Sequence, residues 1–349
     1  MTATKVMVAM SGGVDSSVAA LQLQREGYCC TGAIMRLCDN LTGTETGVAD
    51  AKRIADLLGF TLLVADQTAL FEEKVVGQFV RCYEEGGTPN PCFYCNRHLK
   101  FDALLQEALR QGCDYLATGH YARIEKDPDS GRYLLKKAAD QQKDQSYFLS
   151  CLNQHQLAHT LFPLGGFTKE QVRQLAEQHG FVNAKKKDSQ DICFIPDGDY
   201  RAFLDRYTGK TYPAGDFLDL SGKVVGRHSG AVGYTIGQRK GLGIALGEPA
   251  YVCSKDMGKN TVTVGPDAAL WSTVLRADGW NWISIPGLTE PLRCKARVRY
   301  RHTEQPATVY PEENSIVRVE FDEPQRAITP GQTVVLYDGD VVIGGGTIL

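Results

Sequence analysis

Hydrophobic positions in about the first 120 residues switch between two spacings. Lys5–Met10 and Phe60–Ala65 are short, mostly apolar runs with the length of buried strands. Between them, Val14, Val18 and Leu21 recur at helical spacing. Further strands are predicted at Tyr28–Met35 and Tyr115–Thr118, and further helices around Val48–Leu58, Val75–Tyr83 and Phe101–Leu109. Such alternation predicts an α/β fold, a parallel sheet flanked by helices, with ligands bound beyond the carboxyl ends of the strands.

The pattern changes further along the chain. Residues 123–137 are predicted to form a hairpin around Asp127–Gly131, and Thr168–Gln171 has the form of a capping box that opens a helix ending at Gly180. After about residue 205, glycines and short β-prone runs such as Thr261–Val264 replace the helical signal. We therefore predict an α/β domain over residues 1–205, a small connecting domain over 206–268 and an all-β barrel or sandwich, preferably a β-barrel, over 269–349.

Composition narrows the setting of the chain. Its 349 residues contain neither a run of eighteen apolar residues nor a secretory leader, so we expect a cytoplasmic protein that does not enter a membrane. The eleven irregularly spaced cysteines are then expected to be mostly reduced thiols. The net charge of −3 gives no general attraction to nucleic acid, so a polyanionic partner would need a local basic patch.

The turn between the first strand and the first helix is a candidate phosphate site. Its string Ser-Gly-Gly-Val-Asp-Ser, residues 11–16, lets the backbone approach a ligand, and the helix that follows presents free N–H groups and a positive dipole end. No Gly-Lys-Ser/Thr follows, so it is not a Walker loop. The alternative is a plain tight turn with Ser16 or Asp15 as the helix cap. The string resembles the PP-loop of the ATP pyrophosphatases, which implies an adenine nucleotide alpha hydrolase-like domain and an enzyme that forms AMP and pyrophosphate.

Three cysteines are candidates for chemistry. Cys92 and Cys95 form a C-x-x-C pair after Thr88–Pro91, where the prolines predict an extended loop. Such a pair permits redox chemistry, zinc or an iron–sulfur cluster, although the lack of a second C-x-x-C argues against structural zinc. Two ordinary surface thiols would look the same. Cys193, taken alone, is more typical of a buried core thiol.

Six sequence blocks extend the resemblance over essentially the whole chain. Besides the PP-loop they are Thr88–Asn96, Thr118–Arg123, Lys143–Phe148, Asp188–Phe194 and Gly233–Ile244. Together they are similar to the tRNA-specific 2-thiouridylases. The resemblance implies a tRNA-uridine 2-sulfurtransferase, in which ATP adenylates the 2-carbonyl oxygen of the wobble uridine and a cysteine persulfide then delivers sulfur. It also implies ATP and Mg²⁺ as cofactors and tRNA as partner. A cysteine desulfurase or sulfur-relay protein would be the sulfur donor, and we expect a monomer.

The same resemblance assigns residues by motif. Cys193 matches the persulfide carrier, and Cys95 matches the nucleophile that closes a disulfide with it. The residues that match the ATP site are Ala9, Met10, Ser11, Gly12, Gly13, Val14, Asp15, Ser16, Met35 and Gly119. Those that match the loop around the target base are Asn90, Pro91 and Cys92, and those that match tRNA contacts are His120, Lys143, Asp144, Gln145, Arg299, Tyr300 and Gln332. Asp15 is placed to hold Mg²⁺ against pyrophosphate or to fix the loop.

Cys92 departs from the commonest family pattern, which has aspartate at this position. The aspartate is assigned to proton transfer at the base, and a thiol would replace it only as a weaker acid–base group. Alternatively, Cys92, Cys95 and Cys193 would hold a [4Fe–4S] cluster with one iron free to carry sulfide. We favour the persulfide route and leave the metal content open.

An alternating run supports RNA independently of the resemblance. Arg293, Lys295, Arg297, Arg299 and Arg301 occupy every second position, with Cys294, Ala296, Val298 and Tyr300 between them. In a strand, this spacing predicts five cations on one face, which would attract a phosphate backbone. A solvated edge strand is the plainer interpretation.

Two other functions stay open from the sequence. A PP-loop ligase acting on a small molecule would leave the cysteines and the basic run without a role. A non-catalytic RNA-binding protein would leave the PP-loop without one. ATP–pyrophosphate exchange that depends on tRNA would separate all three functions.

Overall fold

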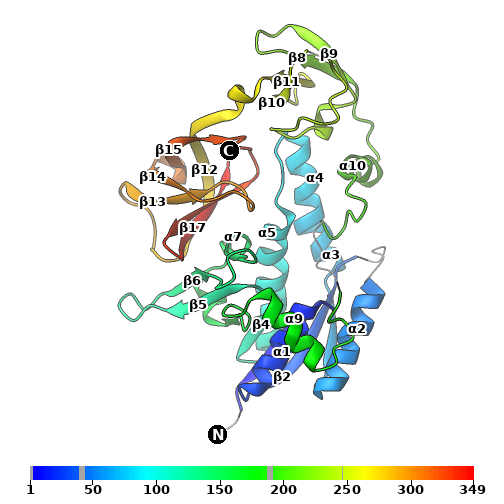
Figure 1. Ribbon diagram of the computed structural model, residues 1–349, viewed down its shortest axis with the longest axis vertical. Helices are drawn as coiled ribbons and strands as arrows, with labels where there is room; N and C mark the ends of the chain where they lie inside the picture. The colour runs from blue at the N-terminus through cyan, green and yellow to red at the C-terminus, as the bar shows by residue number, and fades with distance from the viewer. Residues whose placement is uncertain (1–2, 39–43, 187–191, 246) are drawn as a thin grey trace.

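The computed structural model describes residues 3–38, 44–186, 192–245 and 247–349. They form an α/β part at one end of the molecule, a small four-stranded sheet at the other end, and a β-barrel beside them (Figure 1). Across these ranges no helix combines the length and the apolar character needed to cross a membrane.

The α/β part is built on a five-stranded parallel sheet, which confirms the predicted fold class. In sheet order its strands are β3 (Leu62–Asp66), β2 (Cys29–Arg36), β1 (Lys5–Met10), β4 (Tyr115–Thr118) and β7 (Thr160–Leu161). The central strand β1 is covered on both faces, and Val6, Met7 and Val8 are fully buried. This is why its sequence is a continuous apolar run rather than an alternating one.

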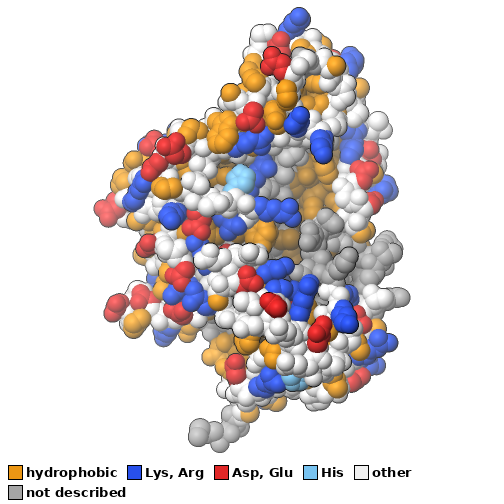
Figure 2. Space-filling model, in the orientation of Figure 1, with side chains coloured by type: hydrophobic (Ala, Val, Ile, Leu, Met, Phe, Trp, Pro, Cys, Tyr) orange, Lys and Arg blue, Asp and Glu red, His pale blue; other side chains and the backbone are white. Residues whose placement is uncertain are grey.

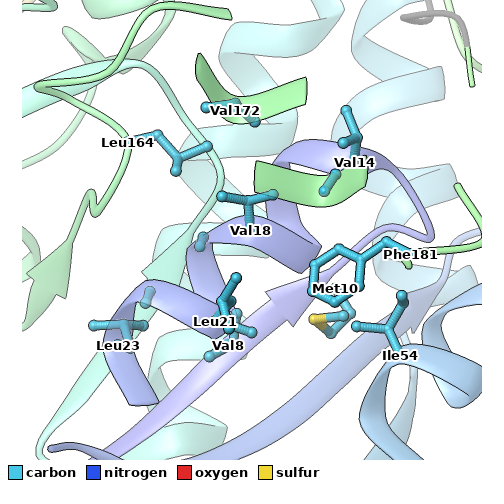
Figure 3. Close-up of a cluster of buried hydrophobic side chains, with 14 of the residues drawn as sticks. Val8, Met10, Val14, Val18, Leu21, Leu23, Ile54, Leu164, Val172 and Phe181 are labelled. Atoms are coloured by element: carbon cyan, nitrogen blue, oxygen red, sulfur yellow. The ribbon is translucent and has the colours of Figure 1, made fainter. Parts of the chain in front are cut away.

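Helices cover both faces of this sheet, and further helices lie beyond it toward the barrel and the small sheet (Figure 1). They are α1 (Val14–Arg25), α2 (Thr44–Leu58), α3 (Thr68–Phe71), η1 (Glu72–Val76), α4 (Gly77–Glu84), α5 (Pro91–Cys95), η2 (Asn96–Ala103), α6 (Leu104–Arg110), α7 (Ser146–Leu149), α8 (Gln154–Ala158), α9 (Lys169–Gln178) and, after them, α10 (Tyr200–Thr208). Val172 of α9 lies against the buried side chains of α1, including Val14 and Val18 (Figure 3). The capping box predicted for α9 is present, because Thr168 and Gln171 exchange side-chain and backbone hydrogen bonds.

The prediction that the chain stays extended up to Cys95 is wrong for its last five residues, which form a helix. Asn90 caps α5 by accepting a hydrogen bond from the Phe93 N–H, and Pro91 occupies the first helical position. Proline is favoured there, because the missing N–H would have had no partner in the helix. Helix α5 runs directly into η2, whose hydrogen bonds have π-helical spacing, and then into α6. Cys92 and Cys95 therefore lie on a helix.

The remaining strands form two further sheets. The small sheet has the order β10 (Tyr251–Asp256), β11 (Thr261–Gly265), β8 (Gly215–Leu218) and β9 (Val224–His228). The barrel strands are β12 (Trp271–Trp282), β15 (Val317–Arg326), β14 (Gln305–Pro311), β13 (Leu292–Arg297), β16 (Thr333–Asp338) and β17 (Val341–Ile348). Short 3₁₀ turns are η3 (Ala231–Gly233), η4 (Asp267–Leu270) and η5 (Glu313–Ser315). Pairing of β12 with β17 closes the barrel, so a sandwich is excluded.

The predicted hairpin at residues 123–137 forms as β5 (Ala122–Lys126) and β6 (Tyr133–Lys137). Unexpectedly, it extends the sheet of the barrel, because Lys136 of β6 pairs with Val341 of β17. Arg132 strengthens this junction by donating to the carbonyl oxygens of Ile283 and Trp282. The barrel is thus fastened to the α/β part, which fixes its position beside α5.

Candidate active site

The turn after β1 offers backbone N–H groups at the start of α1. Gly13 is the N-cap of this helix and no side chain caps it, so the alternative interpretation with Ser16 or Asp15 as cap is wrong. Ser16 donates its hydroxyl to the Gly13 carbonyl oxygen at 3.1 Å and accepts from the Ser11 N–H at 3.2 Å. Uncapped N–H groups and serine hydroxyls at the positive end of a helix are suited to phosphate oxygens.

Two glycines allow neighbouring chain segments to close around this turn. Gly12 has a positive φ of 69°, and a Cβ there would lie 2.4 Å from the Gly47 carbonyl oxygen. A Cβ on Gly119, just after β4, would lie 2.7 Å from backbone atoms of Asp15 and Ser16. The structure therefore brings Gly119 to the loop, as expected from the shared sheet edge. Met35, near the end of β2, is half-buried at the same edge.

Side chains distant in sequence hold the loop. The Lys169 ammonium lies 2.7 and 2.8 Å from the two carboxylate oxygens of Asp15, and the Tyr121 hydroxyl donates to one of them at 2.8 Å. Asn183 and Lys186 both donate to the carbonyl oxygen of Gly12, at 3.2 and 3.3 Å. Sequence reasoning missed these contacts. Lys169 was visible only as part of a capping box, and nothing in the sequence indicated a distance to Asp15.

The candidate thiols are displayed from two anchored segments. Cys92 is exposed and Cys95 half-buried, both on α5. Cys193 is exposed, but the next residues, Phe194 and Ile195, are buried, and the Phe194 ring packs edge-on against Phe79 at 5.2 Å. The Asp188–Asp191 part of the motif lies outside the described residues. The eleven cysteines are all described and all are free thiols.

Burial favours the protonated form of these three thiols. Burial, followed by the nearby Cys95 and Cys92 sulfurs, raises the pKa of Cys193 to about 12, because protein atoms crowd its thiol although part of the side chain reaches solvent. Burial also raises the pKa of Cys92 and of Cys95. The Lys100 ammonium acts in the opposite direction on all three. Lys100 lies on η2 and makes no hydrogen bond or ion pair within the described ranges.

Residues 89–92, which include the segment assigned to the target base, line one pocket together with barrel residues. It has a volume of ≈ 230 Å³ and is lined by Pro89, Asn90, Pro91, Cys92, Tyr147, Phe148, Ile192, Tyr300 and Gln332. The rings of Phe148 and Tyr300 lie 4.4 Å apart, and Gln332 donates to the carbonyl oxygens of Thr88 and Pro89 at 2.9 and 3.2 Å. Aromatic walls beside a thiol suit a flat, unstacked base.

The other predicted tRNA residues divide into exposed and internal groups. Asp144 is buried, and its carboxylate accepts hydrogen bonds from the Ala138 and Ser146 N–H groups and the Ser146 hydroxyl. Gln145 accepts from the Tyr121 N–H at 3.0 Å, so it too supports the fold. Lys143, which directly precedes them in the chain, is half-exposed.

The surroundings of His120 favour its neutral form. Its Nδ1 lies 2.6 Å from the Thr118 hydroxyl oxygen, and its ring packs near Phe101 and Phe162. Burial, followed by repulsion from Lys100, holds the pKa of His120 well below its usual value. The imidazole is therefore uncharged at neutral pH and can offer a hydrogen bond, but no cation, to a ligand.

The basic run does not form the predicted five-cation strand. Strand β13 ends at Arg297, and Arg299 beyond it is half-buried. Arg299 donates to the carbonyl oxygens of Ile236 and Ala327 and to the Thr329 hydroxyl, at 3.2, 3.0 and 2.6 Å. It therefore joins the barrel to the Gly233–Ile244 segment. Arg293 pairs with Asp322, so Lys295 and Arg301 are the exposed cations of the run that form no ion pair with another described residue.

Figure 2 shows the face of the molecule on which the barrel and the helices meet. Lys and Arg side chains border a hollow between the barrel and the helices, and hydrophobic surface lies inside it. On this face, basic side chains are thus distributed around a recess rather than along one strand.

Known families and proteins match this chain over almost its entire length. Family models match in succession: a tRNA methyl transferase HUP domain over residues 4–197, a tRNA methyl transferase PRC-barrel domain over 201–266 and an aminomethyltransferase β-barrel domain over 272–348. A tRNA-specific 2-thiouridylase MnmA of Acetivibrio thermocellus is 49% identical over 359 residues, which span 100% of both chains. Proteins of the same name from Heliobacterium modesticaldum and Clostridioides difficile are 50% and 47% identical, over 99% of this chain and 92% and 98% of theirs.

Proposed function

Because this chain belongs to the tRNA-specific 2-thiouridylases, we propose that it catalyses ATP-dependent 2-thiolation of the wobble uridine in tRNA. The observation that carries the proposal is the pocket between α5 and the barrel, where Cys92 stands among aromatic side chains. Although the matching domain descriptions mention methyl transfer, a PP-loop combined with the accessible thiols of Cys92 and Cys193 supports sulfur transfer.

Adenylation is the first step that the site supports. The uridine 2-oxygen attacks the α-phosphorus of ATP, the bond to the β-phosphate breaks, and pyrophosphate leaves. The Ser11 and Ser16 hydroxyls and the free N–H groups of α1 are suited to hold that leaving group, because they favour the charge that develops on it. The single carboxylate of Asp15 fits a Mg²⁺ ion that travels with ATP, which would screen phosphate charge.

Sulfur transfer follows at the activated carbon. The outer sulfur of a Cys193 persulfide attacks C2, and AMP leaves with the former uridine oxygen. Cys95 then attacks the Cys193 sulfur, which closes a disulfide between the two and releases 2-thiouridine. A cellular thiol must reopen that disulfide before the next cycle. The exposed position of Cys193 supports loading by a sulfur-donor protein such as a desulfurase or relay protein.

The residues around the pocket would orient the tRNA. Tyr300 and Phe148 offer rings for stacking, and Gln332 and Asn90 fix the Thr88–Pro91 backbone against the barrel. Lys143 and His120 are proposed to contact the anticodon arm nearby. Arg299, Asp144 and Gln145 would act indirectly, because each is occupied inside the protein.

An iron–sulfur route remains the alternative because Cys92 supplies a third thiol. However, no group of three His, Cys, Asp or Glu side chains in the described part of the chain, these cysteines included, is arranged to hold a metal ion. Iron analysis of anaerobically purified protein and the activity of Cys92→Asp separate the routes: the persulfide route predicts an active, iron-free variant.

The proposal is tested by mass spectrometry of the anticodon nucleosides. Unmodified tRNA is incubated with the protein, ATP and a sulfur source. We expect 2-thiouridine at the wobble position, dependent on ATP. Consumption of ATP without thiolated nucleoside, with an active sulfur donor present, would contradict the proposed function.

A further inference from the structure

The loop after β1 lacks the lysine that a Walker loop carries within its own motif. A lysine is used there because a compact ammonium offsets the charge of the terminal phosphates. The structure brings an ammonium to this loop from a helix that begins 154 residues after Asp15, where Lys169 is the first residue of α9.

We propose that Lys169 is the phosphate-binding lysine of this site: it rests on Asp15 when the loop is empty and contacts the β- and γ-phosphates when ATP is bound. This assignment rests on the proposed function, because it concerns the adenylation step. It deepens that function by naming a residue that the sequence motif does not contain. It predicts that Lys169 binds the departing pyrophosphate, but not the AMP portion of the nucleotide.

The position of Lys169 is tightly determined. Its backbone N–H donates to the Asp140 carboxylate at 3.0 Å, and the residue is only 8% exposed. Val172, one turn further along α9, packs in the same buried cluster as Val14 and Val18 of α1 (Figure 3). Packing of α9 on α1 therefore holds the ammonium at the first turn of α1, where the free N–H groups begin.

The ion pair itself argues for a role beyond stability. Desolvating both charges of a buried pair costs about as much as their attraction returns, so such a pair is a poor device for stabilising a fold. Here the Asp15 side chain is 31% exposed and the Lys169 side chain 10% exposed, so one partner faces the open loop. A bound Mg²⁺ ion taking the Asp15 carboxylate would release the ammonium toward the phosphates.

Other charges near the loop are already committed. Lys186 also reaches the loop, but it donates to the Gly12 carbonyl oxygen and pairs with Asp50 at 3.0 Å. Its side chain is 43% exposed, which weakens its field. Lys169 is thus the better-desolvated ammonium of the two, and it lies at the start of α1.

The test is calorimetric binding of two probes, inorganic pyrophosphate and AMP, without Mg²⁺. Lys169→Met should weaken pyrophosphate binding by roughly 10- to 100-fold, the range for a lost charge-assisted hydrogen bond, and leave AMP binding unchanged. Lys169→Arg should restore most of the loss. Lys137→Met is the matched control, since that lysine is similarly buried and pairs with Glu304 on the barrel side. It should leave both affinities unchanged.

Asp15→Asn distinguishes this role from a structural one. Without Mg²⁺ it should bind pyrophosphate at least as tightly as the wild type, because the ammonium is released, whereas a merely structural pair predicts equal losses in both single variants. The double variant Asp15→Asn/Lys169→Met leaves no unpaired charge and keeps the test available if Lys169→Met does not fold. It should lose pyrophosphate binding.

Unchanged pyrophosphate affinity in folded Lys169→Met, or a parallel loss of AMP affinity, would overturn the assignment while leaving thiolation intact as a proposal. A wild-type chain that bound neither probe and thiolated no tRNA would instead overturn the proposed function, and the role of Lys169 with it.

Discussion

The loop after β1 and the pocket beside α5 are built in opposite ways. The loop is made by one short stretch, residues 11–16, whose hydroxyls and N–H groups contact one another. The pocket is assembled from the segments around Pro91, Phe148, Ile192, Tyr300 and Gln332. The turn that presents the N–H groups is therefore encoded locally, although Gly119 and Lys169 reach it from distant segments. The site that chooses a base and delivers sulfur depends in addition on the docking of the barrel.

This difference predicts that the two half-reactions can be separated by mutation. Changes in the loop should stop both adenylation and thiolation. Changes in the pocket should stop thiolation and spare nucleotide binding.

Cys193→Ser should abolish thiolation completely, because a hydroxyl cannot carry the outer sulfur, but tRNA-dependent release of pyrophosphate should persist. Both products are measured in one assay, by nucleoside mass spectrometry and a coupled pyrophosphate assay. Cys253→Ser is the control, since that half-buried thiol lies on the small sheet. Thiolated product from Cys193→Ser would remove this cysteine from the mechanism.

Gly119→Ala should weaken nucleotide binding at the loop. The added Cβ would approach backbone atoms of Asp15 and Ser16 to 2.7 Å, and backbone cannot rotate away. Overpacking of this kind costs roughly 1–3 kcal/mol, so ATP affinity should fall by about 5- to 150-fold. Gly166→Ala, which meets nothing within 4 Å, should bind ATP normally. Equal ATP affinities in both variants would place Gly119 outside the nucleotide site.

Tyr300→Ala should affect the pocket side alone. Loss of one stacking surface costs roughly 1–3 kcal/mol per base, which should appear in the kcat/KM for tRNA while the Kd for ATP stays constant. Tyr300→Phe keeps the ring and should retain most activity. If the alanine variant were as active as the phenylalanine variant, the aromatic wall would have no part in holding the base.

Lys100→Met should give the smallest and most specific effect. Its ammonium lowers the pKa of the three thiols, against the larger opposing effect of burial. Without it the pKa of Cys193 and Cys95 should rise, so the fraction of thiolate at any pH below the pKa decreases. Alkylation by iodoacetamide, followed by peptide mass spectrometry from pH 7 to 10, should shift to higher pH. An unchanged profile would show that Lys100 does not act on the thiols.

The sequence predicted local features correctly and missed features that depend on contacts between distant segments. The apolar run of β1, the glycines of the loop and the capping box of α9 are local signals, and each predicted its element correctly. The α5 helix was missed although its signal was present, because Asn90 followed by Pro91 is a helix start as well as an extended turn. Here two local rules competed, and packing decided between them.

Long-range contacts were beyond sequence reasoning. The alternation of exposed and buried positions holds from Arg293 to Ala296, but the strand ends at Arg297 and Arg299 turns inward to three oxygen atoms. Reversing Arg299 to Glu would therefore disturb the junction of barrel and small sheet, and weakened tRNA binding would no longer report phosphate contacts alone. The pairing of Lys169 with Asp15 and the joining of β6 to the barrel depend likewise on tertiary packing.

The central claim is that loop and pocket act on the same uridine carbonyl. Its most direct test uses tRNA labelled with ¹⁸O at the 2-oxygen of the wobble uridine, followed by mass spectrometry of the AMP formed. Adenylation followed by sulfur attack predicts one ¹⁸O atom in AMP for each 2-thiouridine made, because AMP leaves with the oxygen that sulfur replaces. Unlabelled AMP formed alongside thiolated tRNA would contradict the account.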